Sequence, residues 1–373
     1  MHTPDDIASD ASDIAPAQPS PFVHNEAPQP STVRIFALTT RGLEAVSAHE
    51  LALFPGVAVE SHAYRRVWAR CTEVSSLLTA RTVDDVFVWV QNWQHVGRTR
   101  AMLNMMRERS YTLDLREAAA VCAELRPIGT PPTFSVTASF VGKRNYSNDE
   151  IKQAIADGVE NSHEWEYVSD DATADLNVRV FIEHELAMIG VRLAQTALHH
   201  RPYKLTHLHG SLKPPVAAAL LWLLDAQPGQ RLVDPCCGAG TVLIEAAQRG
   251  LSAHGGDTSA EAVDAAQHNI AAANVAASVT AWDARRLPLD DRSTDYVATN
   301  LPWGRQVAVD EELPALYEDV LGEVRRILVP GGRAAILTSR PELVAAPGLV
   351  VEQQIEISLF GQTPTIVLLG VQK

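Results

Sequence analysis

The sequence is poor in cysteine, has no long apolar run and lacks a basic leader. Four cysteines in 373 residues are too few for a disulfide scaffold, and the adjacent pair Cys236 and Cys237 lacks the spacing of metal ligands. No stretch approaches the roughly 18 apolar residues that span a membrane. The first residues also lack the basic, then apolar order of a secretory signal. These absences predict a cytoplasmic protein with no membrane segment and no metal site.

The charge of the chain is acidic overall but unevenly distributed. The formal net charge of −14 argues against a nucleic-acid partner at first sight. Residues 31–152, however, carry fifteen Lys and Arg against twelve Asp and Glu, so the acidic excess lies elsewhere. The composition, 46% hydrophobic and 20% charged, is that of a folded chain, and its length predicts two or three domains.

The strongest local motif is a strand that enters a glycine turn and opens a helix, at residues 232–241. Gly238 and Gly240 permit positive φ and the close approach of a ligand, and the helix start offers free N–H groups. A dinucleotide fingerprint needs a third glycine where this chain has Leu243. Asp234 at the strand end would repel a pyrophosphate, so the turn favours a ligand with a cationic or amino group.

Two more acids follow the next two predicted strands. Asp257 is placed to accept hydrogen bonds from ribose hydroxyls, and Asp283 to accept one from an adenine amine. A single acid at a strand end is more often a helix cap. Three acids on consecutive strands of a parallel sheet, beside a glycine turn, predict an adenosyl ligand at the carboxyl edge.

The fourth predicted strand ends in Asn300-Leu301-Pro302-Trp303, a set suited to a planar amine. The Asn300 side-chain oxygen and the Leu301 carbonyl can accept hydrogen bonds from an exocyclic NH₂. Pro302 stiffens the turn, and Trp303 offers a face on which a flipped-out base can stack. Taken alone, the same residues would also suit a plain turn.

Together these motifs resemble the class I S-adenosylmethionine-dependent methyltransferases, and among them the THUMP-domain RNA methyltransferases that modify the N2 amine of guanine in tRNA. The resemblance rests on DPCCGAGTVLIEAA (234–247), GGDTSAEAVDAAQHNI (255–270), WDARRLPLDDRSTDYVATNLPWG (282–304), LHHRPYKLTHLHGSLKPPVAAALL (198–221), FALTTRGLEAVSAHEL (36–51) and FSVTASFVGKRNYSNDEIKQAIADGV (134–159). The family's amine motif usually has a second proline where this chain has Leu301, a variant found in guanine-modifying members.

The resemblance implies an α/β fold. A C-terminal class I methyltransferase domain, with a Rossmann-like sheet and an antiparallel C-terminal hairpin, follows α+β ferredoxin-like and THUMP domains. The expected boundaries are 1–30 for a disordered tail, 31–105 for the ferredoxin-like domain, 106–197 for the THUMP domain, 198–213 for a linker and 214–373 for the methyltransferase domain.

The resemblance also implies roles for individual residues. Gly238 and Gly240 would lie against the methionine part of S-adenosylmethionine, with Asp234 near its amino group, Asp257 at the ribose and Asp283 at the adenine. The expected cofactor set is Asp234, Cys236, Gly238, Gly240, Thr241, Asp257, Thr258, Asp283, Ala284, Asn300, Ser211 and Lys213. The expected catalytic set is Asn300, Leu301, Pro302 and Trp303.

Cations beside aromatic residues in the N-terminal half, in the linker and after Trp303 are candidate RNA contacts. Such pairs suit single-stranded or end-of-stem RNA, although scattered surface arginines more often serve solubility. The candidates are Arg65, Arg66, Arg98, Arg100, Lys143, Arg144, Arg201, Lys204 and Arg305. His199, His200, His207 and His209 are interpreted as linker residues, because no Cys or acid spacing supports a metal site.

Three alternatives to tRNA guanine methylation stay open. The same chemistry could act on ribosomal RNA or on adenine N6, because the amine motif does not distinguish one exocyclic NH₂ from another. A silent RNA-binding or partner-binding protein could also keep the fold. Retention of Asp257, Asp283 and Asn300 favours an active enzyme over a silent one.

Overall fold

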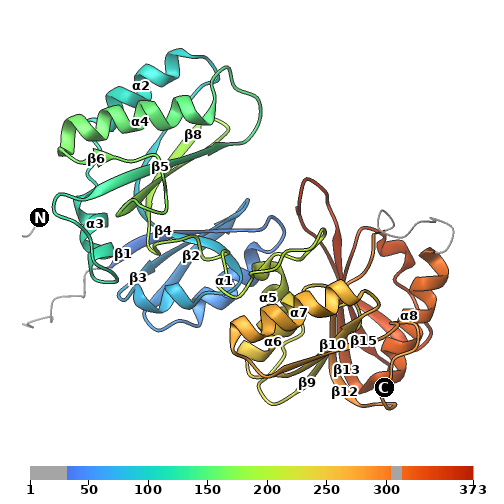
Figure 1. Cartoon of the computed structure of the whole chain (residues 1–373). Coiled ribbons are helices and arrows are strands. Elements are labelled where there is room, and N and C mark those ends of the chain that lie inside the picture. Colours follow the sequence, from blue (N-terminus) through green and yellow to red (C-terminus); the bar gives the residue numbers. More distant parts are fainter. Residues whose placement is uncertain (1–31, 304–312, 373) are drawn as a thin grey trace, which may run out of the picture. The chain divides into compact units, whose positions relative to one another are not determined.

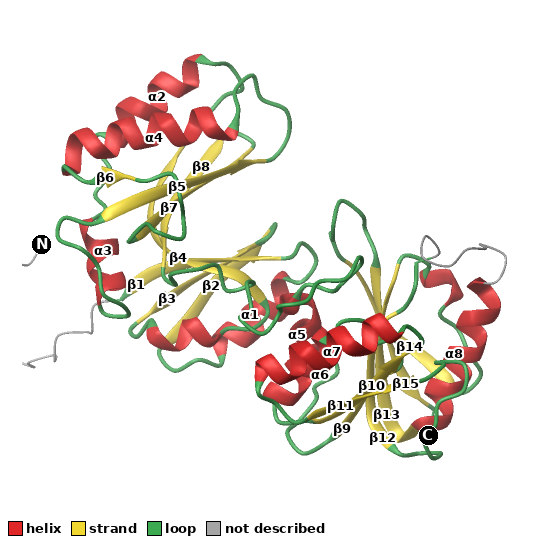
Figure 2. Cartoon of the chain, in the orientation of Figure 1, coloured by secondary structure: helices red, strands yellow, loops and turns green. Residues whose placement is uncertain are grey.

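A computed structural model describes residues 32–303 and 313–372 of the chain (Figure 1). Within these residues the strands form two separate sheets, and helices pack against both (Figure 2). The predicted tail lies outside the described residues, and the domain boundaries drawn from the sequence stay predictions.

The N-terminal sheet has eight strands in the order β2-β3-β1-β4-β8-β7-β5-β6. It is one continuous ladder, because β4 pairs antiparallel with β8 and so joins the first four strands to the second four. The strands are β1 (Val33–Thr39), β2 (Val57–Ala63), β3 (Arg66–Cys71), β4 (Val83–Trp93), β5 (Thr133–Phe140), β6 (Glu166–Tyr167), β7 (Leu176–Glu183) and β8 (Leu186–Arg192).

The helices of this half share one hydrophobic core with one face of the sheet. They are α1 (Glu44–Ala52), α2 (Ala101–Ser110), α3 (Arg116–Ala123) and α4 (Asn148–His163). A capping box starts α4, since the Ser147 side chain accepts from the Glu150 N–H and the Glu150 side chain accepts from the Ser147 N–H.

Helix α2 was not predicted, because its segment shows little apolar periodicity. It packs on α4 at Gly158, where an added Cβ would lie 2.2 Å from Ser110 Cβ.

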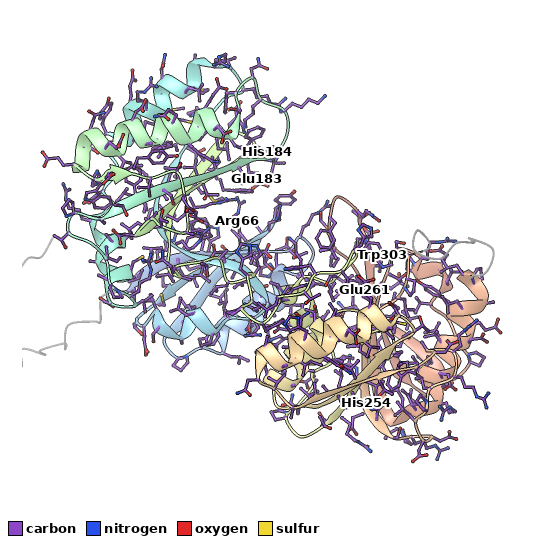
Figure 3. The ribbon with its side chains drawn as sticks, viewed as in Figure 1. Arg66, Glu183, His184, His254, Glu261 and Trp303 are labelled. Atoms are coloured by element: carbon purple, nitrogen blue, oxygen red, sulfur yellow. The ribbon has the colours of Figure 1, made fainter. Side chains whose placement is uncertain are left out.

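The opposite face of this sheet is buried by curvature. Arg66 on β3 forms an ion pair with Glu183 on β7, although three strands lie between them in the sheet (Figure 3). The Arg66 guanidinium also lies 5.6 Å from the ring centre of Phe181. The sheet is therefore curved strongly enough to bring side chains of β3 and β7 together, and side chains that point away from the helices still become buried.

The C-terminal sheet has seven strands in the order β11-β10-β9-β12-β13-β15-β14, parallel except for β15. Helices α5 to α7 belong to one core and α8 to another. The elements are α5 (Pro214–Leu223), β9 (Arg231–Asp234), α6 (Thr241–Gln248), β10 (Ser252–Asp257), α7 (Ala260–Ala273), β11 (Ala277–Ala281), β12 (Thr294–Asn300), α8 (Leu313–Ile327), β13 (Leu328–Thr338), β14 (Leu349–Glu356) and β15 (Thr365–Val371).

This sheet confirms the predicted Rossmann-like fold and its antiparallel hairpin. Strand β15 lies between β13 and β14, so the hairpin is inserted with its last strand inside the sheet. Strand order reverses between β9 and β12, and ligands of doubly wound sheets bind beside such a reversal, at the carboxyl ends of the strands. The predicted acids and the amine motif all follow strands at this edge.

Candidate active site

The glycine turn after β9 has the backbone that the sequence predicts. Gly238 and Gly240 have φ of +49° and +77°. A Cβ on Gly240 would lie 3.0 Å from the Ala266 Cβ of α7, so this glycine permits close helix packing. A Cβ on Gly238 would meet no atom within 4 Å, so the space beside this glycine is open. Thr241, the first residue of α6, is buried beneath the turn.

Asp234 ends β9 as a buried carboxylate with no cationic partner among the described residues. It is 2% exposed, and its Oδ1 accepts a hydrogen bond from the Cys236 N–H at 3.2 Å. Burial raises the pKa of Asp234 to about 7, and the nearby charge of Asp257 adds to the rise. A ligand ammonium group placed here would stabilise the ionised carboxylate.

Asp257 connects the end of β10 to the glycine turn. Its Oδ2 accepts from the Gly238 N–H at 3.0 Å, and its Oδ1 accepts from the Ser259 N–H at 3.1 Å. The carboxylate is only half-buried, so it keeps lone pairs toward solvent. Thr258 beside it is exposed.

Asp283 lies two residues beyond β11 and already has a cationic neighbour. The Arg285 Nη2 donates to its Oδ2 at 2.7 Å, and these hydrogen bonds lower the pKa of Asp283. An adenine amine placed here would share the carboxylate with Arg285. Trp282 before it is buried and donates from Nε1 to the Pro235 carbonyl, which ties this loop to the glycine turn, and Ala284 after it is buried as well.

The amine motif is held rigidly at the end of β12. Trp303 Nε1 donates to Asn300 Oδ1 at 3.1 Å, which leaves that oxygen a second lone pair. The Leu301 N–H donates to the Leu337 carbonyl at 3.1 Å. Tyr317 on α8, 1% exposed, donates to the Pro302 carbonyl at 3.0 Å and contacts Thr338. Tyr317 was not predicted, and it fixes the motif from a different helix.

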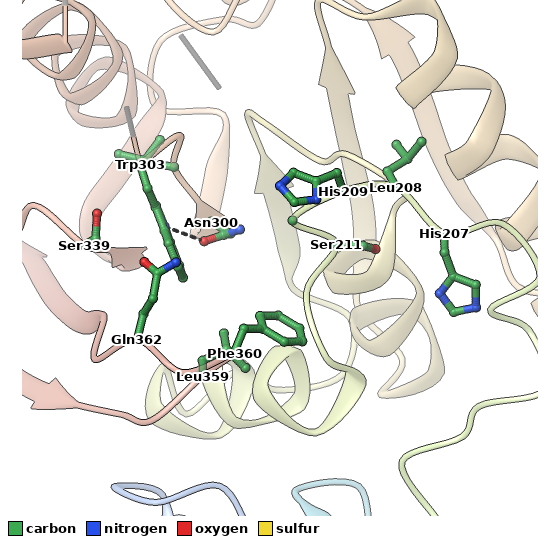
Figure 4. A pocket seen from close by; sticks show the side chains of 12 residues that line it. His207, Leu208, His209, Ser211, Asn300, Trp303, Ser339, Leu359, Phe360 and Gln362 are labelled. Carbon is green, nitrogen blue, oxygen red and sulfur yellow. Dashed lines mark hydrogen bonds between the residues drawn. The ribbon is translucent and has the colours of Figure 1, made fainter. Parts of the chain in front are cut away.

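A cavity of about 710 Å³ opens beside this motif (Figure 4). It brings together the predicted residues Ser211, Asn300, Leu301 and Trp303. The other predicted site residues, among them Asp234, Gly238, Asp257 and Asp283, are not part of its wall. Residues of the linker, of the hairpin turn and of the segment directly after β13 complete the wall, and none of these was predicted as part of the site: His207, Leu208, His209, Gly210, Ser339, Leu359, Phe360 and Gln362.

Phe360 is the most informative of these additions. It is 59% exposed and has a φ of +51°, and Gly361 after it has a φ of +76°. Asn or Asp is the usual residue before glycine in such a tight turn, and a bulky residue with positive φ is an outlier. Strain of this kind costs on the order of 1–3 kcal/mol and concentrates at functional sites. In the sequence, Phe360 stands directly before Gly361, where a tight turn usually has Asn, and this departure was a signal that the turn belongs to a functional site.

Four of the predicted RNA contacts have structural partners instead. Arg66 is paired with Glu183, and Arg144 donates to the Val96 and Gly97 carbonyls and lies against two aromatic rings. Arg201, 9% exposed, contacts Glu245 and the Arg81 carbonyl. Lys204 donates to the Leu212 carbonyl, and burial lowers its pKa to about 8.

Four other predicted contacts are open to solvent. Arg98 and Lys143 are exposed, and the Asn145 N–H donates to the Arg98 carbonyl, so their two loops are adjacent. Arg100 is exposed beside Glu150, and Arg65 is partly exposed. Arg305 lies outside the described residues.

The linker histidines form no metal cluster. No group of three or more His, Cys, Asp or Glu residues with the geometry of a metal site occurs within residues 32–303 and 313–372. His199 donates from its N–H to the Asp84 carbonyl, and its ring lies against His200.

No helix in the described part of the chain is long and apolar enough to cross a membrane.

Comparison with known protein families defines the class. A model for the RMKL-like methyltransferase domain matches residues 201–348, and a model for the THUMP domain matches residues 114–192. The crystal structure of SMU.472, a putative methyltransferase complexed with S-adenosylhomocysteine, has the same fold, with a TM-score of 0.71, 17% identity and coverage of 92% of this chain and 99% of that one. The two matches and the fold are those of a methyltransferase with a THUMP domain.

Two relatives narrow the class further. A tRNA (guanine(6)-N2)-methyltransferase of Thermus thermophilus is 30% identical over 351 residues, which cover 89% of this chain and 98% of that protein. The crystal structure of TrmN from Thermus thermophilus has a TM-score of 0.73 at 27% identity and covers 92% of this chain and 100% of that one. The bovine protein THUMP3 is 29% identical over 223 residues, 55% of this chain and 43% of that protein. The chain belongs to the tRNA (guanine-N2)-methyltransferase family, and S-adenosylmethionine is the cofactor of this enzyme class.

The residues of the site fit this cofactor. Asp234 is a buried carboxylate that lacks a cation among the described residues, and the cofactor carries an ammonium group. The Ser211 Oγ is buried without a hydrogen-bond partner in the described part of the chain, and it can donate to a carboxylate. The space beside Gly238 is open, and the carboxylates of Asp234 and Asp257 both accept hydrogen bonds from this turn.

Proposed function

We propose that this protein transfers a methyl group from S-adenosylmethionine to the N2 amine of the guanosine at position 6 of tRNA. The position comes from the relatives, since the Thermus thermophilus and bovine proteins are both named for guanine 6. The observation that carries the chemistry is the Asn300–Trp303 motif, fixed by Tyr317 at the wall of a cavity that can hold a base.

The cofactor would be held by the strand ends around the glycine turn. Asp234 would pair with its ammonium group, and Asp257 with the ribose hydroxyls. Asp283 would accept from the adenine amine, and Ser211 and Lys213 would contact the carboxylate. When bound, the cofactor would supply an electrophilic methyl group on a positively charged sulfur. The sulfur would keep the electron pair of the carbon–sulfur bond that breaks.

The protein's task is then to orient a weak nucleophile. Hydrogen bonds from the guanine NH₂ to Asn300 Oδ1 and to the Leu301 carbonyl would turn the nitrogen lone pair out of the plane of the ring and toward the methyl group. Such positioning accounts for much of the rate of bimolecular transfers. The nitrogen loses one proton to water after the new carbon–nitrogen bond forms.

Two aromatic side chains would hold the base. Trp303 and Phe360 come from different strand ends, and both border the cavity (Figure 4). A base flipped out of an RNA stem needs stacking partners to offset its lost neighbours. The strained backbone at Phe360 is consistent with this role, because a relaxed turn would carry Asn or Gly there.

The exposed cations of the N-terminal half would bind the RNA. Arg98, Arg100 and Lys143 lie near the loops that precede α2 and α4, within or beside the THUMP match. Their contacts would be mainly to phosphates, so RNA affinity should fall steeply with salt.

Transfer of labelled methyl groups to defined transcripts tests this proposal. The substrates are a tRNA transcript with G6, the same transcript with A6 paired to U, and a fragment of ribosomal RNA. The proposal predicts incorporation into the G6 transcript only. Equal labelling of the ribosomal fragment would contradict the assigned substrate, and labelling of the A6 transcript would contradict the assigned position.

A further inference from the structure

A second, smaller pocket lies close to the catalytic cavity and is not used by the function proposed above. It has a volume of about 360 Å³ and is lined by Arg41, Gly42, Glu44, His62, Ala63 and Tyr64. These residues come from the turn after β1 and the start of α1, and from the end of β2 and the turn that follows it. We refer to it as the Arg41 pocket.

Hydrogen bonding and packing join the Arg41 pocket to the wall of the catalytic cavity. The Ser358 N–H donates to the Arg41 carbonyl at 3.0 Å. Gly42, with φ of +94°, allows this approach, because a Cβ there would lie 2.1 Å from the Glu356 carbonyl oxygen. Two residues after Ser358 comes Phe360, which borders the catalytic cavity. The segment 356–360 therefore contacts the turn that carries the Arg41 pocket and also borders the catalytic cavity.

The chemistry of the Arg41 pocket suits a nucleotide. The Arg41 guanidinium lies 5.9 Å from the ring centre of Tyr64, and both side chains are exposed. Arg41 forms no ion pair with any residue in the ranges 32–303 and 313–372. The one carboxylate in the pocket, Glu44, is engaged by the N–H groups of Gly42 and Arg65 at 2.8 Å each, so it is turned toward the backbone.

We infer that the Arg41 pocket binds the nucleotide next to the target guanosine on the same RNA strand. Its base would stack on Tyr64, and its phosphate would pair with Arg41. A guanosine that flips into the catalytic cavity leaves its neighbours on the strand within reach of the segment 356–360. This inference rests on the proposed function, since it takes the base in the catalytic cavity to be the substrate.

The test uses the full chain and a G6 tRNA transcript that carries the fluorescent base 2-aminopurine beside position 6, on one side or the other. Stacking on an aromatic side chain quenches this base. Wild-type protein should quench one of the two labelled transcripts, and Tyr64→Ala should abolish that quenching and raise the KM for tRNA about tenfold. Tyr64→Phe should behave as the wild type, because its ring is retained.

Arg41→Ala should raise the KM for tRNA several-fold and reduce the slope of log Kd against log salt by about one. Neither variant should change the cofactor Kd. Arg292→Ala is the matched control, because Arg292 is exposed just before β12, at the opposite end of the strands.

The outcomes separate the two proposals. If wild-type protein methylates the G6 transcript while Tyr64→Ala and Arg41→Ala bind and react as the wild type, the inference is wrong and the proposed function stands. If wild-type protein methylates no tRNA, the proposed function is wrong. A purely structural role for Tyr64 would lower Tm in Tyr64→Ala without changing the fluorescence of the labelled base in the bound complex, which would also overturn the inference.

Discussion

The two sheets of this protein relate sequence to function in different ways. In the C-terminal sheet, Asp234, Asp257 and Asn300 end parallel strands, so residues distant in sequence converge on one edge. In the N-terminal sheet, two cations that are neighbours in the sequence differ in burial. Arg65 is partly exposed, whereas Arg66 is buried against Glu183 on the concave side of the sheet.

The comparison teaches which sequence signals can be trusted. A strand-end residue in a parallel sheet is placed by topology, and that placement survives errors of one or two residues in the strand boundary. A residue inside an antiparallel strand changes face with every step. The cation pairs of this half are no easier to predict, because they lie at the ends of strands. Arg65 is in the turn before β3 and Arg66 is its first residue, while Lys143 and Arg144 are in the loop after β5, and one residue of each pair is bound to the protein.

The largest effect should come from a substitution in the amine motif. Asn300→Ala removes the side-chain acceptor that orients the amine, so kcat should fall by about 10²–10³, the usual cost of losing one preorganised polar group. The cofactor Kd should change little. Single-turnover methylation of the G6 transcript measures the first quantity and calorimetry the second; unchanged turnover would place the amine elsewhere.

Arg66→Ala against Arg98→Ala tests the difference between buried and exposed arginines. Removal of Arg66 leaves Glu183 without its partner in a mostly buried setting, so the free energy of unfolding should fall by about 3–5 kcal/mol. Arg98→Ala should leave stability unchanged and weaken tRNA binding a few-fold, with a smaller salt slope. Urea denaturation and filter binding measure both variants. Similar effects of the two substitutions on stability would contradict the comparison.

Asp257→Ala should weaken cofactor binding by about 1.5–3 kcal/mol, the value of hydrogen bonds to a charged group. Part of that loss would come through the Gly238 N–H, which donates to this carboxylate. Asp257→Asn keeps an acceptor and should lose less. Calorimetric titration with S-adenosylhomocysteine gives the affinities, and an unchanged Kd in Asp257→Ala would remove this residue from the site.

The smallest effect is a pH dependence. The pKa of Asp234 is raised to about 7 by burial, so the carboxyl gains its proton as pH falls through that value. A neutral carboxyl cannot pair with the ammonium group, so cofactor affinity should decline below pH 7, approaching tenfold per pH unit. Binding near pH 6 should release a proton.

Calorimetry in two buffers of different ionisation enthalpy measures that proton. Asp234→Asn is the control, because it retains the titration of the ligand's own amino group and removes that of the protein. If the variant and the wild type show the same pH profile, Asp234 does not bind the amino group.

Much of the catalytic half could be predicted because each motif is local. The glycine turn, the strand-end acids and the Asn300 motif each lie within a few residues, and the alternation of strands and helices then supplies the edge on which they meet. The cavity wall could not be predicted in the same way. Tyr317 reaches the motif from α8, and Phe360 reaches it from an inserted hairpin, and neither pairing has a signature in sequence spacing.

The N-terminal half was less predictable because its burial depends on curvature. The curvature of the eight-stranded sheet brings β7 over β3 and buries Arg66 against Glu183, and Arg144 holds three loops together through its hydrogen bonds. Helix α2 escaped prediction because it is stabilised by its contact with α4 at Gly158 more than by an apolar stripe of its own.

Nucleoside mass spectrometry of the G6 transcript after reaction with the purified protein tests the central claim most directly. The account predicts N2-methylguanosine, mapped to position 6 and dependent on Asn300. Methylation of an adenine, of a ring nitrogen of guanine, or of the same amine by Asn300→Ala at the wild-type rate would contradict it.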